Sequence, residues 1–208
     1  MEYTGVIFDA FGTLLEIKSG LHPYRQLLRE GIRHGRRPRS DDVMSILTFN
    51  GGLAEIAEHL EIQIRSQRLS EIEVDLECEV ANIEAFSDAL EAVAYLHQHG
   101  LRVGVCSNLA QPYGQAVRRL FPALDANTFS FEAGVAKPHP ALYEIACNAL
   151  GGNAGQALDV ERVVMIGDSL RCDCHGPRVI GMRGVHLQRS PPGKISSLID
   201  FARLVIRG

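Results

Sequence analysis

The segment Val6-Ile7-Phe8-Asp9-Ala10-Phe11-Gly12-Thr13-Leu14 carries an apolar run directly into a glycine turn. An aspartate at the end of a buried strand costs free energy unless its charge has a partner or a chemical task. Gly12 and Thr13 then supply flexible backbone and a hydroxyl group. Phe11, two residues after Asp9, has no proton to donate. The segment therefore predicts a functional carboxylate next to a position that lacks a second polar group.

Composition limits the possible classes of protein. The chain has 208 residues, of which 46% are hydrophobic, and a formal net charge of -4. It contains no long basic run of the kind that indicates nucleic-acid binding, and no apolar run of the roughly 18–20 residues that span a bilayer. The first residues do not resemble a secretory signal, and the five cysteines are odd in number and scattered. We expect a cytoplasmic protein with reduced thiols, one or two structural units, and neither nucleic-acid nor membrane partners.

Apolar, strand-like runs alternate along the chain with helical patterns. The expected strands are residues 5–10, 101–106, 163–166 and 184–187, with a short one at 128–132, and the expected helices include 86–99 and 140–150. Near-continuous apolar strands separated by helices are typical of a parallel sheet covered on both faces. The pattern predicts an α/β fold with a doubly wound, Rossmann-like core.

Residues 16–85 interrupt this alternation. They show several amphipathic helical patterns, and Ser70-Glu71-Ile72-Glu73 has the capping-box pattern of a helix start. Because this block follows the first strand, we expect it above the carboxyl ends of the sheet, where active sites of open α/β sheets lie. The sequence predicts a core of residues 1–15 and 86–208 with an inserted helical cap of residues 16–85 that acts as a lid.

Polar residues gather where the expected strands end. They are Asp9, Ser107 and Asn108, Lys137, Asp168 and Ser169, and Asp173. Parallel strands bring such ends to one edge, so Asp9 and Asp168 should face each other. Two nearby carboxylates stay ionised cheaply only with a cation between them, and Mg²⁺ accepts carboxylate, backbone and water oxygens. Lys137 adds a positive charge, and Ser107 with the Asn108 backbone can donate to substrate oxygens. This pattern predicts a site in which a carboxylate attacks a small anionic molecule.

Four segments, in order, resemble the motifs of the haloacid dehalogenase-like hydrolase superfamily. They are residues 8–14, 105–108, 134–140 and 164–173, and the helical insert resembles the family's small cap domain. The resemblance implies that Asp9 is the nucleophile that forms a covalent aspartyl intermediate, that Ser107 binds the transferring group, and that Lys137 stabilises the charges. It further implies that Asp9, Asp168 and the backbone carbonyl of Phe11 hold Mg²⁺, with Asp173 supporting that site.

Phe11 departs from the phosphatases of this family, which have a second aspartate there as general acid and base. Such help contributes about 10²–10⁴-fold in rate. The family's dehalogenases instead have an aromatic residue there, because a halide leaving group needs no proton. They also have a functional tyrosine at the position of Tyr143, although the spacing around Tyr143 equally fits a packed helix residue. Yet they use no metal, and they have serine and asparagine where this chain has Asp168 and Leu170.

Three functions remain open from the sequence. The first is a Mg²⁺-dependent, phosphatase-type hydrolase acting on a small phosphorylated substrate whose leaving group needs little protonation. The second is a metal-independent 2-haloacid dehalogenase, and the third is a non-catalytic ligand-binding or regulatory protein. We expect the substrate to contact Phe11, Gly12, Thr13, Asn108 and Ser169. In the cap, Arg25 and Arg29 either reach a substrate anion or lie on a solvated face.

Overall fold

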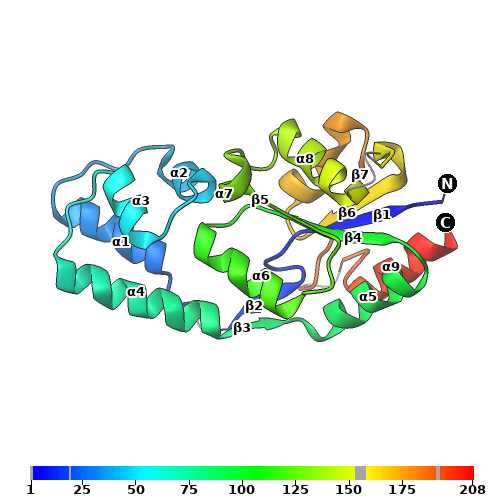
Figure 1. Cartoon of the computed structure of the whole chain (residues 1–208), viewed down its shortest axis with the longest axis horizontal. Coiled ribbons are helices and arrows are strands. Elements are labelled where there is room, and N and C mark those ends of the chain that lie inside the picture. The colour runs from blue at the N-terminus through cyan, green and yellow to red at the C-terminus, as the bar shows by residue number, and fades with distance from the viewer. Residues whose placement is uncertain (1, 19, 153–157, 191–192) are drawn as a thin grey trace.

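The computed structural model describes residues 2–18, 20–152, 158–190 and 193–208. A five-stranded sheet forms its centre, with strand order β5-β4-β1-β6-β7 (Figure 1). The strands are β1 (Gly5–Phe8), β4 (Arg102–Ser107), β5 (Ala126–Phe129), β6 (Val163–Gly167) and β7 (Arg183–His186). All of their pairings are parallel, and Phe8 at the end of β1 lies between Val105 and Ile166. The predicted α/β fold with a parallel sheet is confirmed.

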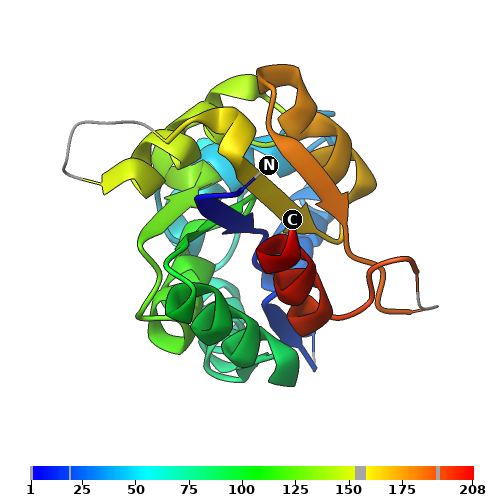
Figure 2. The same ribbon diagram turned by 90° about the vertical axis from the view of Figure 1, so that its right-hand side faces the viewer.

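Helices cover both faces of the sheet, as Figure 2 shows from the end of the core. Val6 and Phe8 point into a hydrophobic cluster with α5 (Ser87–Gln98), α6 (Gly114–Leu120) and α9 (Leu198–Arg207). Ile7 points the opposite way, into a cluster with α8 (Pro140–Gly151). This alternation follows from the two-residue period of a strand, and the two-sided burial explains why β1 is apolar throughout.

Four helices form a third hydrophobic cluster at one end of the sheet (Figure 1). They are α1 (Pro23–Arg33), α2 (Asp42–Thr48), α3 (Leu53–His59) and α4 (Ser66–Ala81). Ala110, three residues beyond β4, packs into the same cluster, so these helices lie at the carboxyl end of that strand. The chain enters and leaves the helical segment through an antiparallel ribbon of β2 (Leu15–Ile17) and β3 (Ile83–Ala85).

Some local predictions were wrong. Residues 128–132 are not one strand, because β5 ends at Phe129 and the short helix α7 (Ser130–Ala133) begins at once. Ser70 lies inside α4 and does not begin a helix, since the helical pattern extends back to Ser66. The ribbon strands β2 and β3 were not predicted from the sequence, because each has only three residues, which are too few for a periodic signal.

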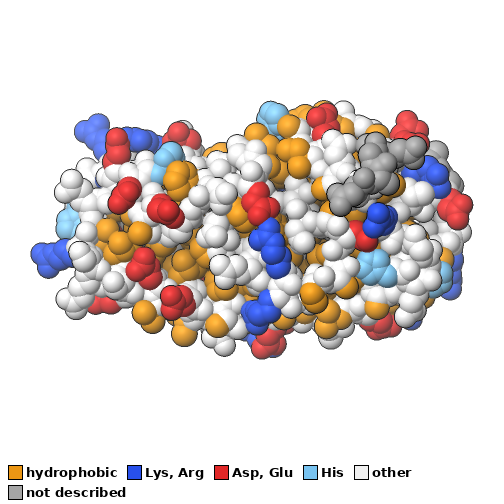
Figure 3. All heavy atoms as spheres, in the orientation of Figure 1, with side chains coloured by type: hydrophobic (Ala, Val, Ile, Leu, Met, Phe, Trp, Pro, Cys, Tyr) orange, Lys and Arg blue, Asp and Glu red, His pale blue; other side chains and the backbone are white. Residues whose placement is uncertain are grey.

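The surface carries charges of both signs. Figure 3 shows acidic and basic side chains interspersed on one face, with hydrophobic side chains between them. Within the part of the chain that the structure describes, no helix has the length and hydrophobicity needed to cross a membrane.

Candidate active site

The strand ends bring the predicted polar residues to one edge of the sheet. Asp9 follows β1 and donates its backbone N–H to the carbonyl of Ile166 in β6, at 2.9 Å. Ser107 ends β4, and Asp168 follows β6. Lys137 reaches the same place from the loop between α7 and α8. Parallel pairing therefore assembles residues that are more than a hundred positions apart in the chain.

Lys137 lies at the centre of this group. Its buried ammonium donates to Asp9 Oδ1 at 2.7 Å, to Asp173 Oδ1 at 2.7 Å and to the carbonyl of Cys106 at 2.8 Å. Burial on its own lowers the pKa of Lys137, but the carboxylates of Asp9 and Asp173 outweigh this effect and raise it. Lys137 is therefore a permanent cation that orients Asp9 through one carboxylate oxygen.

Asn108 holds Lys137 in this position. Its side-chain carbonyl accepts from the Lys137 backbone N–H at 2.7 Å, and its amide donates to the Lys137 carbonyl at 2.9 Å. A reciprocal pair of this kind fixes the loop in one orientation. The Asn108 side chain therefore stabilises the loop that carries Lys137. The substrate contact that the sequence predicts for the Asn108 backbone stays a prediction.

Asp173 is fully buried, and both of its oxygens have partners. Oδ1 accepts from Lys137, and Oδ2 accepts from the backbone N–H of Ser169 at 2.9 Å. Burial, together with the charge of Asp9, raises the pKa of Asp173 to about 6 although Lys137 acts in the opposite direction. The one-turn helix η4 (Leu170–His175) carries Asp173, and Ser169 caps it by accepting from the Cys172 N–H at 3.2 Å.

Three carboxylates meet at this edge. Asp9, Asp168 and Asp173 each have an oxygen within 4.8 Å of the others. Burial and the charge of Asp9 raise the pKa of Asp168, which indicates incompletely neutralised negative charge. Gly12 allows Asp168 to lie close to the turn that follows Asp9. It has φ +75°, and a Cβ at this position would lie 2.2 Å from Asp168 Oδ2.

An all-oxygen set of donors with excess negative charge fits a hard divalent cation such as Mg²⁺. Asp9 and Asp168 have oxygens free of the protein contacts described above, whereas Asp173 is already bonded at both. Asp173 therefore suits a supporting position, and the supporting role that the family resemblance implies for it stays a prediction. The expected ligation by the Phe11 backbone carbonyl stays a prediction.

Two neighbouring hydroxyl groups and one tyrosine complete the predicted set. Ser107 and Thr13 are buried, and Thr13 Oγ1 has no hydrogen-bond partner among the described atoms. Contacts of Ser107, Thr13 and Ser169 with substrate stay predictions. Tyr143 is fully buried in the core, and its hydroxyl donates to the Cys172 carbonyl at 2.6 Å. Tyr143 thus matches the packed helix residue that its spacing also allowed.

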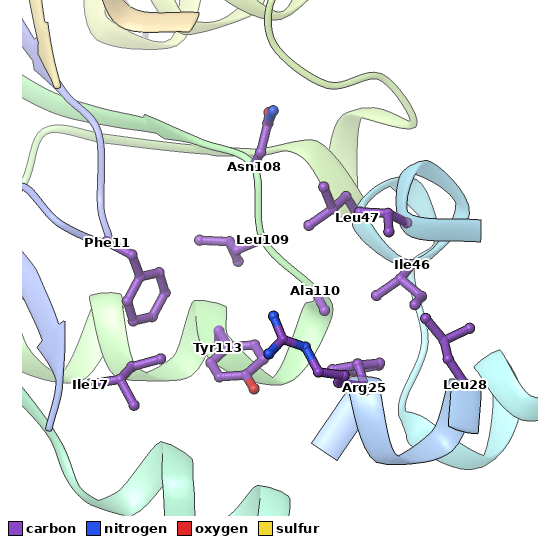
Figure 4. A pocket seen from close by; sticks show the side chains of 12 residues that line it. Phe11, Ile17, Arg25, Leu28, Ile46, Leu47, Asn108, Leu109, Ala110 and Tyr113 are labelled. Atoms are coloured by element: carbon purple, nitrogen blue, oxygen red, sulfur yellow. The ribbon is translucent and has the colours of Figure 1, made fainter. Parts of the chain in front are cut away.

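A cavity of about 330 Å³ adjoins this cluster, between the sheet edge and the helices α1 and α2 (Figure 4). Phe11 and Asn108 line its near end, and Ile46 and Leu28 line the far end. The ring of Phe11 meets the edge of Tyr113, with ring centroids 5.7 Å apart. Most of the remaining lining is aliphatic. The aromatic residue at position 11 thus forms part of a wall, rather than an acid–base group.

A model of the haloacid dehalogenase-like hydrolase family matches residues 3–181. The chain belongs to this family. Similar solved structures include a HAD phosphatase from Thermococcus onnurineus, with 18% identity over 99% of this chain and 98% of that one and a TM-score of 0.66. A structure described as a dehalogenase has 19% identity over 99% and 98% of the chains, with a TM-score of 0.63. CbbY from Rhodobacter sphaeroides, in complex with phosphate, has 18% identity over 99% and 100%, with a TM-score of 0.61. Curated protein sequences give no match.

Both chemical branches thus occur among structures that share the fold of this haloacid dehalogenase-like hydrolase. At such identities the likeness concerns the fold alone, so the reaction must be argued from the site.

Sequence reasoning missed the contacts between the helical segment and the core. Tyr113, in the short helix η1 (Gln111–Tyr113), donates to the buried Glu79 of α4 at 2.5 Å. Within the helical segment, Glu79 also accepts from the His22 backbone N–H at 2.9 Å. Ser130 donates to the Leu47 carbonyl of α2 at 2.5 Å. These bonds join residues 34 to 83 positions apart, and no short motif encodes such distances.

Arg189 is a further residue that the sequence did not reveal. Its guanidinium donates to the Thr13 carbonyl at 2.9 Å and makes two bonds to Asp88, at 3.0 and 3.1 Å. It also lies over the ring of Phe86, 4.1 Å from the centroid. Arg189 therefore supports the turn that follows Asp9 from outside the site.

Proposed function

We propose that this hydrolase removes a phosphoryl group from a small substrate through a covalent intermediate on Asp9. The observation that carries the proposal is the buried ion pair in which Lys137 holds Asp9 Oδ1 at 2.7 Å beside the carboxylate of Asp168. Asp9 and Asp168 would hold a divalent cation, which would supply positive charge that offsets these carboxylates and the substrate phosphate.

In the proposed reaction, Lys137, Asp9, Ser107 and Asn108 have different roles. Lys137 fixes one oxygen of Asp9, so the other oxygen is available to attack phosphorus while the bond to the leaving oxygen breaks. Ser107 and the backbone of Asn108 would donate to phosphoryl oxygens. Water then hydrolyses the resulting acyl phosphate, which releases phosphate and restores the Asp9 carboxylate. Lys137 stays charged throughout.

The leaving group receives little help from the protein. Phe11 has no proton to donate, and among the described residues that line the cavity, the ionisable side chains are Tyr24, Arg25 and Tyr113. Burial raises the pKa of Tyr24, and burial together with the bond to Glu79 raises that of Tyr113, so both are weak acids. We therefore propose substrates that leave readily without protonation, such as aryl or acyl phosphates.

We further propose that residues 16–85 serve as the cap and that residues 1–15 and 86–208 form the catalytic core. The separate hydrophobic cluster of α1–α4 supports this division, as does the ribbon of β2 and β3 that joins it to the core. The cap would exclude water from the acyl phosphate until the leaving group departs.

A second candidate is a 2-haloacid dehalogenase. Phe11 and the apolar cavity favour it, because halide departs without a proton. Asp168 opposes it, because its charge would repel both Asp9 and the carboxylate of a haloacid.

One set of assays tests these proposals. We expect Mg²⁺-dependent phosphate release from phenyl phosphate and acetyl phosphate, slower release from alkyl phosphates, and no halide release from 2-chloropropionate. Asp9→Asn should abolish turnover, whereas Asp200→Asn, an exposed residue on α9, should not. Halide release that is indifferent to a chelator would support the dehalogenase instead. No turnover of either substrate class would support a ligand-binding protein.

A further inference from the structure

One arginine of the helical segment stands out by its surroundings. Arg25 on α1 lines the cavity, and its side chain extends toward the middle of the space (Figure 4). Among the described residues it has no hydrogen bond or ion pair within contact distance. Four other arginines of this segment bind carboxylates: Arg33, Arg36, Arg39 and Arg68. Among the described arginines of the segment without an ion pair, all of them exposed, Arg25 is the one that lines the cavity. Arg25 is thus a cation at an apolar cavity with its charge uncommitted.

Apart from Arg25, few polar side-chain groups line the cavity, and the Tyr24 hydroxyl is the one without a hydrogen-bond partner among the described atoms. The Asn108 amide is bonded to Lys137, and the Tyr113 hydroxyl is bonded to Glu79. Among the described lining residues none is acidic. A sugar in this space would leave several hydroxyl groups without partners, at a cost of about 1–3 kcal/mol for each. The lining therefore favours an apolar occupant.

The size of the cavity supports a ring. Apolar cavities of about 150 Å³ hold benzene, and this cavity has about 330 Å³. Its near end at Phe11 lies beside the proposed phosphoryl site, and Arg25 reaches in from α1. One aromatic ring that carries one substituent fits this volume.

We propose that the natural leaving group is an aromatic group that bears an acidic substituent, and that Arg25 binds this substituent. The proposal rests on the proposed phosphatase reaction and specifies its substrate class. A guanidinium binds a carboxylate through two parallel, charge-assisted hydrogen bonds. Arg25 would thus select the acid, while the aliphatic lining selects its apolar body.

Kinetics with matched substrates and variants tests the selection. We compare kcat/KM for 4-carboxyphenyl phosphate, phenyl phosphate and glucose 6-phosphate in the wild type, Arg25→Gln and Arg29→Gln. Arg29 lies one turn further along α1, is exposed, and does not line the cavity. We expect the wild type to prefer the carboxyphenyl over the phenyl ester by about tenfold or more, as one charge-assisted pair provides. Arg25→Gln should remove this preference, and Arg29→Gln should keep it.

A binding measurement separates this proposal from the phosphatase reaction. We expect 4-hydroxybenzoate to bind the wild type more tightly than phenol does by calorimetry, and the difference to vanish only in Arg25→Gln. If this difference in binding is found but no phosphate is released, the phosphatase reaction is refuted, and the proposal that the cavity and Arg25 bind an aromatic acid stands. Phosphate release with an unchanged substrate ratio in Arg25→Gln, or with glucose 6-phosphate preferred, would overturn the assignment and keep the phosphatase.

Discussion

Replacing Lys137 with methionine tests the electrostatic core of the site. Methionine keeps most of the apolar stem, so the change removes chiefly the ammonium. That ammonium, with a side chain only 2% exposed, bonds the carboxylates of Asp9 and Asp173 and the carbonyl of Cys106. Lys137→Met therefore leaves two buried carboxylates without their cation.

The expected cost follows from these contacts. Removing one partner of a buried ion pair destabilises a protein by about 3–5 kcal/mol. The two lost charge-assisted hydrogen bonds, at about 1.5–3 kcal/mol each, give a similar total of about 3–6 kcal/mol. Against a total stability of about 5–15 kcal/mol, the variant should be near its folding limit.

The loss of stability in Lys137→Met should depend on pH, and the pKa of the buried carboxyl groups determines the direction of this dependence. Asp173 already has a pKa of about 6, above its value of about 3.9 in an unfolded chain. Losing Lys137 raises this pKa further, because Lys137 lowers it in the wild type. A carboxyl group with a raised pKa binds its proton more tightly in the folded state, so stability falls as pH rises. We therefore expect a small penalty near pH 5 and the full penalty near pH 8.

Urea unfolding at both pH values, with a chelator present, measures this difference. Lys18→Met is the matched control, because Lys18 pairs with Glu84 on the exposed surface, where water screens the interaction. Mg²⁺ should recover part of the stability that Lys137→Met loses at pH 8, since a cation replaces the missing charge. Equal destabilisation by the two variants at pH 8, or a penalty that is larger at pH 5, would refute the reasoning.

Three further outcomes are expected. Gly12→Ala should lower the free energy of unfolding by about 1–2 kcal/mol, because a positive φ is unfavourable for an L-residue. It should also weaken the thermal stabilisation by Mg²⁺, because the added Cβ displaces Asp168. An unchanged response to Mg²⁺ would contradict this contact. Phe11→Asp should speed alkyl phosphate hydrolysis by about tenfold or more, since general acids contribute about 10²–10⁴-fold, and the absence of a gain in a folded variant would argue against phosphate esters. The hydrogen bond to Arg36 holds the pKa of Asp42 at about 2, so its contribution to stability is present above pH ~4 and is lost as pH falls toward ~2. In Asp42→Asn, the free energy of unfolding should therefore change less between pH ~4 and pH ~2 than in the wild type. An unaltered pH dependence in this range would show that the Arg36–Asp42 pair does not stabilise the protein in solution.

The sheet and the position of its functional edge were predictable from sequence. Strands such as β1 and β6 are buried on both faces, so their apolar runs are visible without any tertiary information. Because parallel strands end together, Asp9 and Asp168 had to meet once the strands were recognised. The helical segment was predictable in kind, since its amphipathic helices differ from the strand pattern of the core.

Shorter elements were not predictable, for a physical reason. The strands β2 and β3 form only by pairing with each other, and their partners are distant in the chain: Glu16 pairs with Glu84, 68 residues later. Likewise, the apolar alternation at Phe129 and Phe131 suggested a continuing strand, whereas these rings stack on each other with centroids 5.5 Å apart at the turn into α7.

The sequence by itself determined which chemistry-bearing residues stand at the strand ends, because burial periodicity and parallel pairing follow from local pattern. Tertiary structure decided how their side chains are used. It directs Asn108 to the Lys137 backbone, bonds both oxygens of Asp173, and ties Tyr113 to Glu79. It also forms the apolar cavity that Phe11 and Arg25 both line. These outcomes depend on contacts between distant elements, where side-chain direction and burial are set only after the chain has folded.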